Sequence, residues 1–180
     1  RELDTDGIDP GATYLIVNTG TAGSGHALKF YYAGRYDRDF KDQSVTVKNE
    51  EGVCYIASGF SGEADCQFQF SAANSGNIQH SGYFVDLYED KFSSDSSRTM
   101  SFINEGGGQY RIRYDSWWFD RVYYLRYNNN DWAGSTESST VYLYKLVERV
   151  LSYDVSYNGN GNTSGTLPGN ATEIEPGNTY

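Results

Sequence analysis

Residues 141–146 read Val-Tyr-Leu-Tyr-Lys-Leu, a run that is apolar at nearly every position. Successive side chains of a strand point to opposite faces. One face therefore carries Val141 and Leu143, and the other carries Tyr142 and Tyr144. Both faces are largely apolar, which is typical of a strand that is covered on both sides and not of an exposed edge. The run predicts a strand that closes a barrel or lies inside a sandwich.

Similar short segments recur along the whole chain. Segments rich in Tyr, Val, Ile and Phe alternate with clusters of Gly, Asn, Ser and Asp, which is the pattern of strands joined by turns. The predicted strands are residues 13–18, 44–48, 53–57, 67–71, 83–88, 99–103, 110–114, 122–127 and 140–147. Almost nothing has the period of a helix, so we expect an all-β fold.

Three similar units indicate how these strands are arranged. An aromatic-x-apolar segment begins at Tyr14, Phe68 and Tyr110, and each is followed 14 to 16 residues later by a second apolar segment. The units start 54 and 42 residues apart, and three four-strand units of that length are typical of a β-trefoil, in which a closed barrel removes open sheet edges. Hairpins also resemble one another in an ordinary sandwich. We expect a β-trefoil-like barrel followed by a short β extension, with a β-sandwich as the alternative.

Composition and charge narrow the class of protein. The chain has 180 residues with 17 Tyr, 9 Phe and 3 Trp, against only 26 Leu, Ile and Val. Buried aromatic rings supply the core that the aliphatic residues lack. No apolar run approaches the ~20 residues that a membrane-spanning helix needs. The formal net charge of −10 argues against binding to nucleic acid or to an acidic membrane, because both require a basic face.

The two cysteines and the acidic N-terminal loop bear on the cellular setting and on metals. A Gly-containing loop joins the strands of Cys54 and Cys66. We expect a disulfide between them and an oxidising, extracellular location, with two unrelated buried thiols as the alternative. Asp4, Asp6 and Asp9 lack the distal Glu of a calcium loop, so we interpret them as a solvated acidic turn. We expect no metal and no cofactor.

The three tryptophans lie within sixteen residues, and residues 109–127 beside them carry four Arg against two Asp. Aromatic rings stack on the C–H faces of sugars, while Asn, Asp and Arg bind hydroxyls; the same residue types dominate protein interfaces. The alternatives are that one or two Trp fill the core and that the chain's own carboxylates neutralise the Arg pair. The candidate ligand-binding residues are Trp117, Trp118, Asp120, Arg111, Arg113, Tyr127, Asn129, Asp131 and Trp132.

The C-terminal part has a different character and resembles a known repeat. Residues 153–168 read YDVSYNGNGNTSGTLP, which resembles the opening of the Listeria–Bacteroides repeat (the internalin-B-type B repeat), a stalk module of wall-anchored surface proteins of Gram-positive bacteria. Residues 8–147 resemble a second, β-rich module of gut Firmicutes surface proteins, in phrases such as GATYLIV at 11–17 and STVYLY at 139–144. The resemblance implies a binding domain at residues 1–148 and the stub of a stalk-type repeat at 149–180.

These observations predict a non-enzymatic, monomeric binding or adhesion module on the bacterial cell surface. No nucleophile motif is present, and nothing in the sequence places two carboxylates across a cleft. We expect a host glycan as the ligand. The alternatives are a host protein, such as immunoglobulin bound in a superantigen-like way or a mucosal glycoprotein, and a purely structural spacer.

Overall fold

The computed structural model describes residues 1–34, 37–87, 92–93, 98–116, 120–147, 153–155 and 171–174. This part of the chain holds strands and one short 3-10 helix, η1 (Glu63–Cys66). The chain divides into two units, Arg1–Leu146 and Val147–Tyr180, close to the boundary at residue 148 that the composition predicts. In the second unit, β16 (Tyr153–Val155) pairs antiparallel with β17 (Ala171–Ile174); the remaining residues of the predicted stalk repeat lie outside the described ones. None of the described residues forms a helix suited to spanning a membrane.

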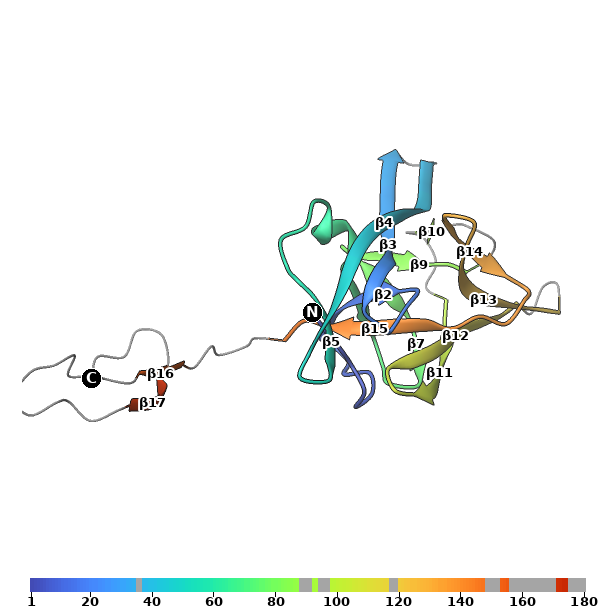
Figure 1. Cartoon of the computed structure of the whole chain (residues 1–180). Helices are drawn as coiled ribbons and strands as arrows, with labels where there is room; N and C mark the ends of the chain where they lie inside the picture. Colours follow the sequence, from blue (N-terminus) through green and yellow to red (C-terminus); the bar gives the residue numbers. More distant parts are fainter. Residues whose placement is uncertain are drawn as a thin grey trace, which may run out of the picture. The chain divides into compact units, whose positions relative to one another are not determined.

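Six antiparallel strands of the first unit form a closed barrel (Figure 1). They are β1 (Glu2–Leu3), β2 (Thr13–Val17), β3 (Gly23–Gly34), β4 (Asp37–Glu50), β5 (Val53–Ile56) and β15 (Val141–Lys145). Each strand pairs with the next in the order β2, β3, β4, β5, β1, β15, and β15 pairs back with β2. The predicted all-β, trefoil-like barrel fold is therefore confirmed.

Further strands extend the same sheet from the two sides of the β2–β15 pair. They are β6 (Phe68–Phe70), β7 (Ser75–Gly76), β8 (Ile78–His80), β9 (Tyr83–Val85), β10 (Phe92–Ser93), β11 (Met100–Gly106), β12 (Gln109–Ser116), β13 (Arg121–Asn128) and β14 (Asp131–Ser135). β6, β8, β9 and β10 continue from β2, whereas β12, β11 and β7 continue from β15. The β13–β14 hairpin pairs with β12.

The β2–β15 pair separates two hydrophobic cores. Val141 and Leu143 enter the larger core, which holds most of the buried aromatic rings, while Tyr144 enters the smaller core inside the barrel. β2 alternates in the same way, with Tyr14 and Ile16 in the larger core. The predicted strand with two buried faces is thus confirmed, because residues 141–145 form a wall between two packed interiors.

Candidate functional site

The predicted ligand-binding residues do not form one site. Trp117 and Trp118 lie outside the described residues. Trp132 is 0% exposed and belongs to the larger core, so the prediction that it contacts a ligand is wrong. The physical reason is the register of the β13–β14 hairpin, in which Trp132 lies opposite Tyr127 and both rings turn inward, 5.3 Å apart.

Arg111 and Arg113 lie on the outer face of β12, as predicted, because alternate residues of this strand fill the core. Each already has a carboxylate partner. Arg111 pairs with Glu105 at 2.5 Å, and Arg113 pairs with Asp115 at 2.7 Å. The alternative that the chain's own carboxylates neutralise these two Arg residues is confirmed.

Asn129 and Asp131 lie at the tip of the β13–β14 hairpin. They line a shallow pocket of about 420 Å³ together with Arg126 and Asn128. Arg126 forms an ion pair with Glu137. No aromatic ring lines this pocket among the described residues, since the hairpin turns its rings inward. Asp120 is exposed before β13 and does not line the pocket.

The predicted disulfide is wrong, because Cys54 and Cys66 are free thiols. Cys54 lies on β5, where its sulfur accepts a hydrogen bond of 3.5 Å from the side-chain amide of Asn49, whereas Cys66 ends η1 and is buried in the smaller core. Burial of Cys66 raises its pKa to about 12.

The acidic N-terminal turn is structural and only partly solvated. Asp4 is 8% exposed and accepts hydrogen bonds from the Tyr14 hydroxyl at 2.8 Å and from the backbone N–H of Asp6 at 3.0 Å. Asp9 pairs with Lys145 at 3.0 Å. The interpretation as a solvated turn is therefore wrong for Asp4. Within the described ranges, no group of acidic, His and Cys side chains is arranged to hold a metal ion.

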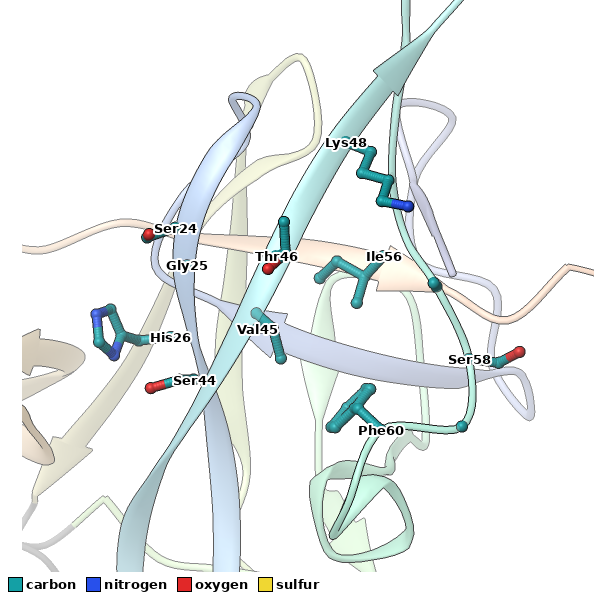
Figure 2. Close-up of a pocket in the computed structure, with 12 residues that line it drawn as sticks. Ser24, Gly25, His26, Ser44, Val45, Thr46, Lys48, Ile56, Ser58 and Phe60 are labelled. Carbon is teal, nitrogen blue, oxygen red and sulfur yellow. The ribbon is translucent and has the colours of Figure 1, made fainter.

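A larger pocket, of about 580 Å³, lies beside the barrel where β4 and β5 separate. Pairing of these strands ends where Val47 faces Ile56. From there β4 continues toward its hairpin with β3, whereas the chain after β5 turns away through residues 57–60. The gap between β4 and these residues is the pocket drawn in Figure 2, which we call the β4–β5 pocket.

The β4–β5 pocket combines an apolar floor with polar groups. Val45 and Ile56 are buried and form part of the lining with the half-buried ring of Phe60. Figure 2 shows Thr46, Lys48 and Phe60 arranged around Ile56. The lining hydroxyls belong to Ser24, Ser44, Thr46 and Ser58. Within the described part of the chain none of these hydroxyls forms a hydrogen bond and Lys48 forms no ion pair, so all remain available to a ligand.

Glu63 fixes the loop that carries Phe60. Its carboxylate accepts a hydrogen bond of 2.6 Å from the backbone N–H of Gly59 and pairs with Arg1 at 2.7 Å. The Arg1 and Glu63 side chains are only 4% and 14% exposed. The backbone N–H of Glu63 also donates to the carbonyl of Phe60 at 3.2 Å. These contacts hold the backbone of the loop that carries Phe60.

His26 connects this pocket to the β13–β14 hairpin. Its Nδ1 lies 2.8 Å from a carboxylate oxygen of Asp42. The imidazole stacks on the ring of Tyr127, with centroids 4.5 Å apart and planes at 19°. Tyr127, which the sequence places among the ligand-binding residues, thus packs between His26 and Trp132.

Comparisons with protein-family models, with curated proteins and with solved structures find no match to this chain. The pocket residues were not predicted from the sequence. One signal was present, because Ser44, Thr46 and Lys48 alternate along a predicted strand and so share its exposed face.

Proposed function

We propose that this chain is a non-enzymatic binding module that recognises a glycan in the β4–β5 pocket. The observation that carries the proposal is the ring of Phe60, which lies near Ile56 in a pocket whose lining also includes four hydroxyl residues without partners among the described residues (Figure 2). An apolar ring suits the C–H face of a sugar. Hydroxyl groups both donate and accept hydrogen bonds, which suits sugar hydroxyls. A concave site of about 580 Å³ is of the size that small ligands occupy.

The setting that we propose is the bacterial cell surface, with the module presented to host glycans by a wall-anchored protein. The resemblance of residues 153–168 to a stalk repeat supports this location. The acidic chain also fits a partner other than nucleic acid.

A glycan array probed with the intact chain tests the proposal. Phe60→Ala should weaken binding by about tenfold or more, because the ring loses its contact with the ligand. Tyr31→Ala is the matched control, since Tyr31 is 41% exposed on β3 and does not line the pocket. A blank array with folded protein, or equal binding by the Phe60 variant, would reject glycan binding in this pocket.

A second candidate function is recognition of a host protein, such as immunoglobulin, by the outer face of β12 and β13. There Arg113 lies directly opposite Tyr124, and both side chains are half-buried. Arg and Tyr contribute strongly to the energy of protein interfaces. Capture of a serum or mucosal protein that is lost in Tyr124→Ala and kept in Phe60→Ala would support this function in place of glycan binding.

A further inference from the structure

Among the described residues, Lys48 and Arg121 both lack a carboxylate partner, but only Lys48 lines the β4–β5 pocket. Carboxylate partners are present for seven cationic side chains, namely Arg1, Lys29, Arg98, Arg111, Arg113, Arg126 and Lys145. Lys48 has no such partner among the described residues, although the chain has 24 Asp and Glu and only 14 Lys and Arg. Its ammonium is therefore an uncompensated positive charge in the wall of a pocket.

Two carboxylates beside this pocket, those of Glu50 and Glu63, are engaged by other groups. Glu50 shares the exposed face of β4 with Lys48, but it accepts a hydrogen bond of 2.5 Å from the hydroxyl of Tyr55. Glu63 is held by Arg1 and by the backbone of Gly59. Neither of these interactions involves Lys48. The Lys48 ammonium can therefore pair with an anionic ligand without breaking a contact within the protein.

We propose that the ligand of the β4–β5 pocket is an acidic sugar, whose carboxylate or sulfate pairs with Lys48 while its ring lies on Phe60. The proposal rests on the glycan-binding function proposed above and names the class of sugar. Thr46 lies two residues from Lys48 on the same face of β4, so its hydroxyl serves the neighbouring sugar oxygens. A hydrogen bond between charged groups is about twice as strong as a neutral one, so the anionic group decides the selectivity.

A glycan array of matched pairs tests this inference with the intact chain. The pairs are a uronic acid and the corresponding neutral hexose, a sialylated glycan and its desialylated form, and a sulfated glycan and its unsulfated form. The wild type should favour the acidic member of a pair by about tenfold, and added salt should reduce this preference. The uronic and sialylated pairs report a carboxylate, and the sulfated pair reports a sulfate.

Three variants assign the preference to Lys48. Lys48→Met should remove it, Lys48→Arg should keep it, and the control Lys145→Met should leave it unchanged, because Lys145 pairs with Asp9 away from the pocket. Equal binding of acidic and neutral members by the wild type would overturn the acidic-sugar inference and leave glycan binding intact. A preference that persists in Lys48→Met would overturn it as well. Absence of any glycan signal from the folded wild type would overturn both proposals.

Discussion

The position of Trp132 in the structure differs from the role that the sequence predicts for it. A tryptophan beside Asn and Asp suggested an exposed ligand contact, but the ring fills the larger core. Its Nε1–H is buried without a hydrogen-bond partner within the described part of the chain. This unsatisfied donor adds no stability to the core. The local sequence cannot show this, because the face of a hairpin that becomes buried depends on what packs against it.

We predict that Trp132→Ala lowers the free energy of unfolding by about 3–5 kcal/mol, because it leaves a large cavity. Trp132→Phe keeps most of the ring volume and should cost clearly less. Chemical denaturation monitored by circular dichroism measures both values. A Trp132→Ala variant as stable as the wild type but unable to bind glycan would return this residue to the ligand site.

The two cysteines differ in burial and should therefore differ in reactivity. Cys54 is half-buried, whereas Cys66 is buried with a pKa raised to about 12, so Cys66 holds almost no thiolate near neutral pH. A thiol reagent should label Cys54 first and Cys66 only after unfolding. Because the pKa of Cys66 is higher in the folded chain, its contribution to stability should be complete below about pH 8.5 and fall as pH rises toward 12. Finding no free thiol in the unreduced, unfolded chain would contradict the assignment.

At the scale of elements, His26 of β3 and Tyr127 of β13 link the barrel to the β13–β14 hairpin. We predict that His26→Ala and Tyr127→Ala are coupled by about 0.5–1.5 kcal/mol in a double-mutant cycle, because the two rings stack on each other. Denaturation of the two single variants and the double variant measures this energy. Losses that add within about 0.3 kcal/mol would show that the stack does not join the two elements.

The strands could be predicted because their side chains alternate between two faces. The pockets could not be predicted, because each is formed by segments that are distant in the sequence. The sequence is sufficient to place Ser44, Thr46 and Lys48 on one exposed face of a strand. It does not show that β5 parts from β4 after Ile56 or that Phe60 then lines the same space. Of the long β3–β4 hairpin only residues 44–48 and the apolar segment around Leu28 were predicted, and β14 was missed, since Gly and charged residues interrupt the apolar pattern there.

At the scale of the whole molecule, all residues of the two described cores belong to residues 1–146. We therefore predict that a chain of residues 1–146 folds alone and unfolds cooperatively within a few degrees of the full chain. Thermal unfolding followed by circular dichroism compares the two. A truncated chain without a cooperative transition would show that residues 147–180 complete the fold.

The apolar residues at 141–146 correctly predicted a strand that is covered on both faces, because one face lines the interior of the barrel and the other lines the larger core. They could not show that two separate cores share this strand. The proposed ligand site lies at the margin of the smaller core, where β4 separates from β5, and hydrophobic pattern alone does not mark such a place.

An NMR titration of the chain with a glycan selected on the array shows where the glycan binds. If it binds in the β4–β5 pocket, the largest chemical-shift changes should occur at Thr46, Lys48, Ile56 and Phe60. Changes confined to Asn129 and Asp131 on the β13–β14 hairpin, with the β4–β5 pocket unaffected, would contradict binding in this pocket.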